Sequence, residues 1–270
     1  MEANTNKTPD TPQMIWRKEG AIGWMIFNRP ERHNAVSFEM WEAIPRILDE
    51  FEADNEVRVI VLRGAGGKAF ISGADISQFE EKRSSEEATA IYNEAVDVAN
   101  NRLHTCPKPT IAMIEGYCIG GGAGLAVCCD FRVASPDSTF AIPAAKLGLG
   151  YGFPGVKRLV DLIGPSYAKE IFYTARKFSA QEAAHIGLIN RMVERDGIEA
   201  YIQDFAGTIA ANAPMTIHAV KVSVAETLKD GAERDLGLVE RLVDECFASE
   251  DYQERRRAFM EKSKPVFKNR

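Results

Sequence analysis

Short apolar runs alternate with glycine-rich loops and amphipathic segments along most of this chain. Two runs flanking Glu19-Gly20 predict a β-hairpin within residues 15–27. Apolar, β-branched runs predict buried strands, and positions at helical spacing predict intervening helices. The predicted strands cover 57–62, 110–114 and 131–134, and the predicted helices cover 37–53, a segment ending near Leu103, and 123–129. This alternation indicates an α/β fold of repeated ββα-like units with largely parallel sheets.

The two ends of the chain follow different patterns. Residues 1–13 are polar and rich in Thr, Asn and Pro, which predicts a disordered tail. Residues 14–200 carry the strand and helix alternation and are the predicted core. From about Gly197 onward only helical spacing remains, so residues 201–270 are the predicted helical extension. Such an extension docks on its own core or on a neighbouring subunit.

Composition narrows the class of protein. The net charge of −6 argues against general nucleic-acid binding. No run reaches the ~20 apolar residues of a membrane span, so no membrane partner is expected. The five cysteines lack metal-ligand spacing and are typical of small buried side chains in a reducing compartment. We therefore expect a cytoplasmic protein without a metal site.

Two glycine-containing segments, 72–76 and 116–125, are the most informative part of the chain. Each follows an apolar run and precedes a helical pattern, where small residues allow a ligand to approach the main chain. The first N–H groups of a helix have no partner within it. One N–H from each segment could polarise a single carbonyl oxygen, which would make an oxyanion hole. The alternative to a ligand-binding role is that these glycines only allow tight packing of a helix on a sheet.

Several common catalytic motifs are excluded. Leu62 and Ala69 stand where a phosphate-binding P-loop ending at Gly67-Lys68 needs a glycine and a hydroxyl residue. The glycines at 120, 122 and 124 lack the G-x-G-x-x-G spacing of a dinucleotide site. The chain has no G-x-S-x-G nucleophile elbow, and its four histidines are scattered.

In combination, these segments resemble the crotonase superfamily, also called the enoyl-CoA hydratase/isomerase family. The resemblance extends from about residue 15 to the end of the chain. Its motifs are Asn28-Arg29-Pro30 with Asn34-Ala35, residues 68–76, Gly116-Tyr117 with Gly120-Gly121-Gly122, Cys129-Asp130, Phe140 with Pro143, Leu147-Gly148, residues 179–183, Gly187-Leu188-Ile189 and residues 259–262.

The resemblance implies a crotonase-type spiral of ββα units with a C-terminal helical region that trimerises, giving a homotrimer or a dimer of trimers. It implies an acyl-CoA substrate, so coenzyme A would be part of the substrate and no separate cofactor is expected. By position, the backbone N–H groups of Ala74 and Gly121 would form the oxyanion hole for the thioester carbonyl.

The resemblance also implies a set of substrate-binding residues. Lys68 matches a position near the CoA phosphates, and residues 32–33 and 74–76 would line the adenine and pantetheine. Phe259 and Lys262 match residues that reach the CoA of a neighbouring subunit. The complete set is Arg32, His33, Lys68, Ser72, Asp75, Ile76, Phe259 and Lys262.

The chain lacks the acidic residues that catalyse the reaction in typical members of the family. A typical hydratase uses two glutamates to activate one water, and the matching positions here are Gly124 and Ala144. A third position, where many isomerases carry an acid, is Gly152. Adding water across a double bond needs a positioned base and acid. The usual hydratase mechanism is therefore in doubt.

Tyr151 is the protic side chain that remains, and with a pKa near ~10 it is a hydrogen-bond donor rather than a base. The segment 143–156 resembles the methylmalonyl-CoA decarboxylases, in which the matching tyrosine orients the substrate carboxylate. Loss of CO₂ generates the enolate without a base. That branch carries a histidine at the position of Ala74, which is a departure. The leading hypothesis is decarboxylation of a short 2-carboxyacyl-CoA.

Two other hypotheses stay open. The protein could be an enoyl-CoA hydratase or isomerase that recruits another acid, with Glu115 and Asp75 nearest in sequence. Alternatively, it could be a CoA-binding oligomer without catalysis, or an RNA-binding member of the superfamily, against which the acidic charge counts.

Overall fold

The computed structural model describes residues 11–78 and 85–269. Residues 1–10, most of the predicted disordered tail, lie outside the described residues. The last part of that prediction is wrong, because residues 11–13 pack on the core. Gln13 O accepts a hydrogen bond from Asn28 N at 2.7 Å, and Ser37 Oγ donates to Gln13 Oε1 at 2.6 Å. The core therefore begins at Thr11, which is buried.

A six-stranded sheet forms the base of the molecule, with the order β1-β2-β3-β5-β7-β10. The predicted hairpin is confirmed as the antiparallel pair β1 and β2, and the remaining neighbours pair in parallel. The strands are β1 Met14–Glu19, β2 Ile22–Phe27, β3 Val59–Gly64, β5 Thr110–Ile114, β7 Phe131–Ala134 and β10 Arg191–Met192.

A second, four-stranded sheet runs in the order β4-β6-β8-β9. Each of its first three strands follows a strand of the large sheet and precedes a helix, which gives three successive ββα turns and confirms the predicted spiral. The strands are β4 Ala69–Ile71, β6 Tyr117–Ile119, β8 Thr139–Ala141 and β9 Phe178–Ser179, and the helices that close the turns are α3 Glu86–His104, α4 Gly121–Cys128 and α5 Phe153–Thr174.

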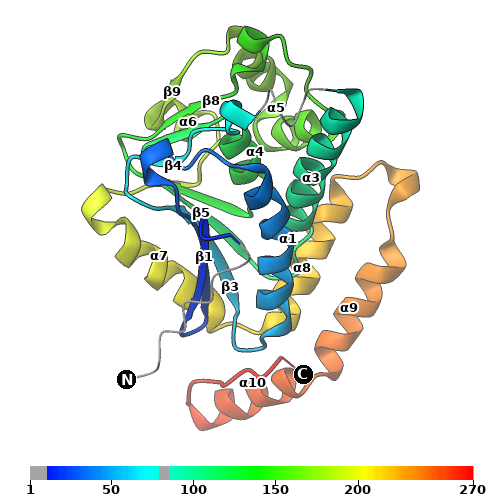
Figure 1. Ribbon diagram of the computed structural model, residues 1–270. Coiled ribbons are helices and arrows are strands. Elements are labelled where there is room, and N and C mark those ends of the chain that lie inside the picture. Colours follow the sequence, from blue (N-terminus) through cyan, green and yellow to red (C-terminus); the bar gives the residue numbers. More distant parts are fainter. Residues whose placement is uncertain (1–10, 79–84, 270) are drawn as a thin grey trace.

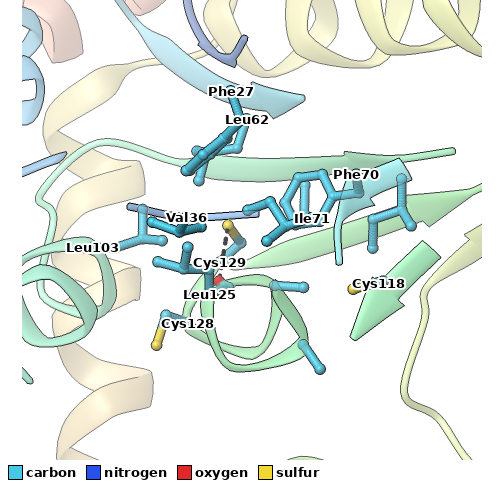
Figure 2. Close-up of a cluster of buried hydrophobic side chains, with 14 of the residues drawn as sticks. Phe27, Val36, Leu62, Phe70, Ile71, Leu103, Cys118, Leu125, Cys128 and Cys129 are labelled. Atoms are coloured by element: carbon cyan, nitrogen blue, oxygen red, sulfur yellow. Dashed lines mark hydrogen bonds between the residues drawn. The ribbon is translucent and has the colours of Figure 1, made fainter. Parts of the chain in front are cut away.

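Helix α4 lies at the centre of the molecule because its side chains are apolar all round. Figure 2 shows Leu125 and Cys129 packed among Val36, Phe70 and neighbouring core residues, and these four side chains are all buried. Helix α1, Phe38–Ala53, follows its N-cap Ser37, lies within the predicted range 37–53 and covers the same core. Helix α6, Ala180–His185, begins with a capping box formed by Ser179 and Glu182.

Helix α7, Arg195–Ala210, covers the opposite face of the large sheet (Figure 1). Ile198, Ile202 and Ala206 lie one turn apart on its inner side and are buried against a cluster that includes Trp24 and Val59. The predicted division at residue 200 is therefore wrong, because it cuts a helix that belongs to the core.

The remaining described elements after α7 are helical, and the last of them extend from the body. Helix α8, Pro214–Thr227, is held to the core by Lys221 Nζ, which lies 2.7 Å from Asp130 Oδ2. Helices α9, Leu236–Ala248, and α10, Glu250–Glu261, form an arm (Figure 1). The 3₁₀ helices are η1 Pro30–Arg32, η2 Ile76–Gln78, η3 Pro143–Leu147 and η4 Gly231–Glu233. No helix in the described part is long and apolar enough to cross a membrane.

Candidate active site

The two glycine-containing segments meet at one edge of the small sheet. Strands β4 and β6 are parallel neighbours, so the segments that leave their carboxyl ends emerge side by side. Residues 72–74 follow β4, and Gly121 begins α4 directly after β6. A Cβ built on Gly121 would lie 3.8 Å from Ala74 N. The structure thus brings together the two main-chain groups that the sequence singled out.

Both N–H groups are available to a ligand. Val36 bridges the two neighbours of Ala74, donating to Gly73 O and accepting from Asp75 N, each at 2.9 Å. This alternation leaves the Ala74 N–H on the opposite side. Gly121 is the first residue of α4, where helical bonding does not reach. Within the described part of the chain, neither group donates to another backbone carbonyl.

Some of these glycines also allow the close packing of α4 on the small sheet, which was the alternative explanation for the glycine cluster. A Cβ on Gly122 would lie 2.4 Å from Ile71 O, which only a glycine avoids. At Gly121 a Cβ would lie 3.1 Å from the Trp41 ring. Close packing of α4 on β4 is therefore what brings the helix N-terminus to Ala74.

Tyr151 reaches the same helix from the loop before α5. Its Oη lies 3.5 Å from the place that a Cβ on Gly124 would occupy. The ring packs edge-on against Phe172, with centroids 4.7 Å apart, and lies close above Gly155, where a Cβ would be 2.6 Å from Cε1. The tyrosine hydroxyl therefore lies beside the position from which a hydratase glutamate would extend.

The environment of Tyr151 keeps its hydroxyl protonated. The residue as a whole is 37% exposed, but its hydroxyl end lies inward near α4. Burial raises the pKa of Tyr151 to about 12, with a smaller increase from the Cys128 thiol and an opposing effect of Arg158. At neutral pH the group is a hydrogen-bond donor and not a base.

Asn100 and Cys128 lie near the same part of α4 as the tyrosine hydroxyl, and neither stands out in the sequence as a site residue. Asn100 Oδ1 lies 3.9 Å from the Cβ position of Gly124 and accepts a hydrogen bond from Cys128 Sγ at 3.5 Å. Burial raises the pKa of Cys128 to about 11, so the thiol is protonated. Asn100 belongs to α3, and only tertiary packing reveals its place here.

The two acids of the hydratase hypothesis, Asp75 and Glu115, both lie close to arginine side chains. Asp75 Oδ2 lies 2.8 Å from Arg29 Nη1, and its Oδ1 accepts from Ser77 Oγ at 2.6 Å. Burial alone would raise the pKa of Asp75, but the bonds from Ser77 and Arg29 outweigh it and lower that pKa. Burial raises the pKa of Glu115, although its carboxylate lies near Arg63 and Arg195 at 3.8 and 3.7 Å.

Five of the predicted CoA-binding positions lie in the segments next to Ala74 and strand β4. Ser72 N donates to His33 O at 3.1 Å, and Ser72 Oγ approaches Arg32 O at 3.5 Å. Lys68 is exposed at the start of β4, where its carbonyl accepts from Tyr117 N. Ile76 begins the 3₁₀ helix η2. Their role in binding CoA stays a prediction.

Two residues that the sequence analysis did not single out as ligands lie beside these segments. The Tyr117 ring lies edge-on to His33, with centroids 6.0 Å apart, and Lys177 Nζ lies 5.0 Å from the Tyr117 ring. Lys177 precedes β9, the neighbour of β8 at the end of the small sheet. Strands this short leave no periodic signal that would have placed the two residues together.

Phe259 and Lys262 are not brought to this site within one chain. Both belong to α10 or its end, at the opposite end of the molecule from β4 and α4 (Figure 1). Phe259 is 70% exposed and Lys262 is exposed as well. Their predicted contact with CoA therefore requires a second subunit and stays a prediction.

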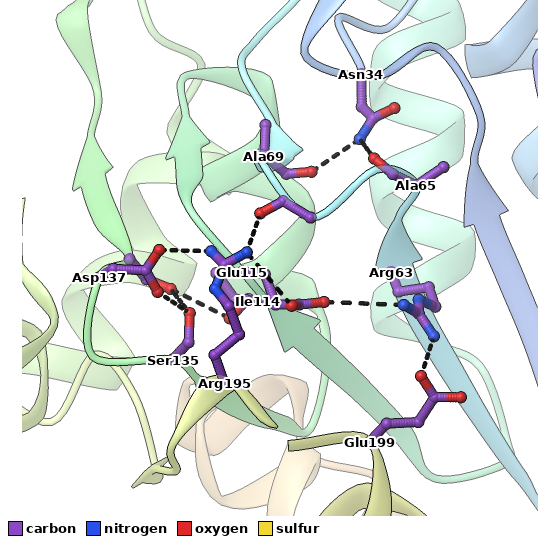
Figure 3. A network of polar contacts seen from close by, with 12 residues as sticks. Asn34, Arg63, Ala65, Ala69, Ile114, Glu115, Ser135, Asp137, Arg195 and Glu199 are labelled. Atoms are coloured by element: carbon purple, nitrogen blue, oxygen red, sulfur yellow. Dashed lines mark hydrogen bonds and ion pairs between the residues drawn. The ribbon is translucent and has the colours of Figure 1, made fainter. Parts of the chain in front are cut away.

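Charged residues gather at the carboxyl edge of the large sheet instead (Figure 3). Arg63 Nη1 lies 2.8 Å from Glu199 Oε2, while Arg195 pairs with Asp137 and donates to Gly67 O at 2.5 Å. These contacts fasten α7 to the loop that carries Lys68. No group of three His, Cys, Asp or Glu side chains suited to a metal ion occurs in the described ranges.

The fold places the N-terminus of a glycine-rich helix beside the Ala74 N–H, an arrangement that suits the binding of a carbonyl oxygen. The model of the enoyl-CoA hydratase/isomerase family matches residues 17–270, and the chain belongs to that family. It is an enzyme that acts on acyl-CoA.

Similar proteins cover nearly the whole chain. The short-chain-enoyl-CoA hydratase of Clostridium acetobutylicum is 34% identical over 95% of this chain and 98% of its own length. The crotonyl-CoA hydratase of Syntrophomonas wolfei is 32% identical, over 94% and 97%. A crystal structure described as an enoyl-CoA hydratase/carnithine racemase from Magnetospirillum magneticum superposes with a TM-score of 0.91 at 34% identity, over 99% of both chains.

Proposed function

We propose that this enzyme decarboxylates a short 2-carboxyacyl-CoA through a thioester enolate. The observation that carries the proposal is the Tyr151 hydroxyl beside Gly124, next to a helix whose N-terminus faces Ala74 N–H. A neutral donor takes the place where a hydratase has a carboxylate. A site with two main-chain donors and one phenol can stabilise an enolate but has no base to form one by proton removal.

The reaction that suits this site breaks the bond between C2 and the carboxylate carbon. Its electron pair moves into the C1–C2 bond as CO₂ leaves, and negative charge develops on the thioester oxygen. The N–H groups of Ala74 and Gly121 stabilise that oxygen, and they stabilise it more in the transition state than in the ground state. Water then protonates C2, and the resulting hydroxide combines with CO₂ as bicarbonate. No redox cofactor or external base enters this balance.

Tyr151 has an orienting role in the proposed reaction. The breaking bond must stand perpendicular to the thioester plane so that its electrons enter the enolate π system. A hydroxyl fixed near Gly124 can donate to the substrate carboxylate and hold it out of that plane. A carboxylate at this position would repel the substrate carboxylate, so the absence of acids fits this substrate better than an enoyl thioester.

The acyl group is short in this proposal. The Tyr151 ring and Phe172 stand beside the middle of α4, and the Tyr151 hydroxyl occupies the space above Gly124. A long acyl chain passing along α4 would have to displace this aromatic pair. We therefore place malonyl-, methylmalonyl- and ethylmalonyl-CoA as the first substrates to test.

Hydration of an enoyl-CoA is the second candidate, favoured by the names of the two relatives described above. It would need an acid other than the two glutamates that are replaced here. Asp75 is committed to Arg29 and Ser77, and Glu115 faces Arg63 and Arg195. Substituting each acid by its amide and assaying crotonyl-CoA hydration tests this candidate.

The proposal extends to assembly. None of the thirteen residues of α9 is buried, although Leu236, Val243 and Phe247 are large and apolar. Such a helix is stable when it packs on another surface. We place a second copy of the chain there, in a trimer or a dimer of trimers, which would also bring Lys262 near a neighbour's CoA. Analytical ultracentrifugation of Phe247→Glu should show loss of the oligomer seen for the wild type.

The test of function is release of labelled CO₂ from 2-carboxyacyl-CoA that carries ¹³C in its free carboxylate. The wild type should release label and Tyr151→Phe, which keeps the ring and removes the donor, should release it more slowly. Absence of CO₂ from all three substrates, together with hydration of crotonyl-CoA, would reject the proposal in favour of the second candidate.

A further inference from the structure

Arg29 stands directly behind the segment that presents the Ala74 N–H. Its Nη1 donates to Ala35 O at 2.8 Å and lies 2.8 Å from Asp75 Oδ2. Both side chains are largely buried, with 13% of Arg29 and 9% of Asp75 exposed. Asp75 follows Ala74 directly, so this ion pair holds the residue next to the proposed oxyanion donor.

The loop that holds Arg29 is itself rigid. Asn34 is fully buried and has a left-handed backbone, with φ at 56°, which asparagine tolerates better than most residues. Its Oδ1 accepts from Arg29 N at 2.9 Å. Its Nδ2 donates to Ala65 O at 3.0 Å and Ala69 O at 2.8 Å, as Figure 3 shows. The loop is thus fixed to both ends of the turn between β3 and β4.

Main-chain bonds complete the connection. Val36 N donates to Gly73 O and Val36 O accepts from Asp75 N. The Arg29 loop therefore holds the peptide on both sides of Ala74 by main-chain bonds and holds the next side chain by an ion pair. The Arg29 loop therefore fixes the direction in which the Ala74 N–H points.

We propose that Arg29 is a positioning residue of the oxyanion hole, which it serves by holding Asp75 and by compensating its charge. This inference rests on the proposed function, because it assumes that the Ala74 N–H stabilises the enolate. The charge has a specific consequence. A buried carboxylate one residue from the donor would oppose an enolate anion, and the guanidinium cancels that opposition.

The experiment compares Arg29→Gln, Arg29→Lys, Asp75→Asn and the double variant Arg29→Gln/Asp75→Asn. Arg102→Gln is the matched control, since it breaks an ion pair between α3 and α1 that does not touch residues 72–76. Infrared difference spectra record the carbonyl stretch of bound propionyl-CoA labelled with ¹³C at the thioester carbon. Circular dichroism confirms that each variant is folded at the assay temperature.

We expect the wild type to lower the carbonyl frequency relative to free propionyl-CoA, and Arg29→Gln to lose most of that shift. Its kcat should fall about tenfold or more with a smaller change in KM, because a misplaced donor acts mainly in the transition state. Arg29→Lys should recover part of the shift. The double variant should be more active than Arg29→Gln, because no uncompensated carboxylate remains.

A full carbonyl shift and unchanged kcat in folded Arg29→Gln would overturn the inference while leaving the oxyanion hole intact. A double variant no more active than Arg29→Gln would overturn its electrostatic part. An unshifted carbonyl in the wild type would overturn the oxyanion assignment itself, and the inference with it. The wild-type spectrum thus separates failure of the inference from failure of the proposed function.

Discussion

The carboxyl edges of the two sheets are used in opposite ways. Beyond the large sheet, Arg63, Glu115 and Arg195 form part of a charged cluster that fastens α7 to the Gly67 turn. Beyond the small sheet lie the main-chain N–H groups of Ala74 and Gly121, the two donors of the proposed oxyanion hole. Ligands of parallel α/β sheets commonly bind beyond the carboxyl ends of strands. The difference teaches that charge marks the structural edge here, whereas unpaired backbone donors mark the chemical one.

The largest effect should come from removing one of those donors. Ala74→Pro deletes the Ala74 N–H, which donates to no backbone carbonyl of residues 11–78 or 85–269, whereas Ala74→Gly retains it. Loss of an oxyanion donor costs about 10²- to 10³-fold in kcat, so we expect Ala74→Pro to lose that much and Ala74→Gly to keep most activity. Steady-state kinetics with a thermal melt on each variant measures this. Equal activity of the folded pair would remove Ala74 from the site.

Tyr151→Phe should have the next largest effect. The hydroxyl is the part of the ring nearest the Gly124 position, and the contacts with Phe172 and Gly155 involve the ring itself. We expect kcat to fall roughly 10- to 100-fold, as for a lost orienting hydrogen bond, with little change in melting temperature. Stopped-flow assay of labelled CO₂ release measures the loss. A Phe variant as fast as the wild type would leave Tyr151 as a pocket-lining ring only.

A substitution in the charged cluster should lower the stability of the protein more than its turnover rate. Arg195→Met removes the bond to Gly67 O and the pair with Asp137 at a half-exposed side chain. We expect a loss of about 1–2 kcal/mol in unfolding free energy and a kcat within about threefold of the wild type. Urea unfolding and kinetics on one preparation test both. A larger fall in kcat than in stability would contradict the contrast between the edges.

The smallest effect should be that of pH on kcat. Tyr151, with a pKa raised to about 12, remains a donor across the neutral range, and a lowered Asp75 pKa keeps that carboxylate ionised there. We expect a flat kcat from about pH 6 to about pH 9, since no base titrates in that range. Activity should fall only as alkaline pH approaches the tyrosine pKa. A bell-shaped profile centred near neutrality would reveal an acid and base missing from this account.

Much of the fold follows from local patterns, because long apolar runs and caps carry their own signal. Strand β5 has the predicted bounds, 110–114, and α1 covers residues 38–53 of the predicted 37–53. Strands β4, β6 and β8 were not placed individually, since three residues give no period. The division at residue 200 was wrong because helical spacing alone does not show that α7 packs on the sheet.

The candidate site likewise has a part that the sequence predicts and a part that only tertiary packing reveals. The two segments were accessible from the sequence because each begins where an apolar run ends and small residues follow, and the family resemblance pointed to Ala74 and Gly121 within them. The approach of Tyr151 to Gly124, and of Arg29 to Asp75, depends on how helices and loops distant in sequence pack together. The resemblance of residues 143–156 to the decarboxylases suggested a role for Tyr151, whereas the motif at residues 28–30 suggested no particular role for Arg29.

The most direct test of the central claim is a competition in ²H₂O. The enzyme is given equal amounts of methylmalonyl-CoA and crotonyl-CoA, and the products are identified by mass spectrometry. This account predicts propionyl-CoA that carries one deuterium at C2 for each CO₂ released, with crotonyl-CoA unchanged. Hydrated crotonyl-CoA alongside intact methylmalonyl-CoA would contradict it and would show that an acid and a base act at this site after all.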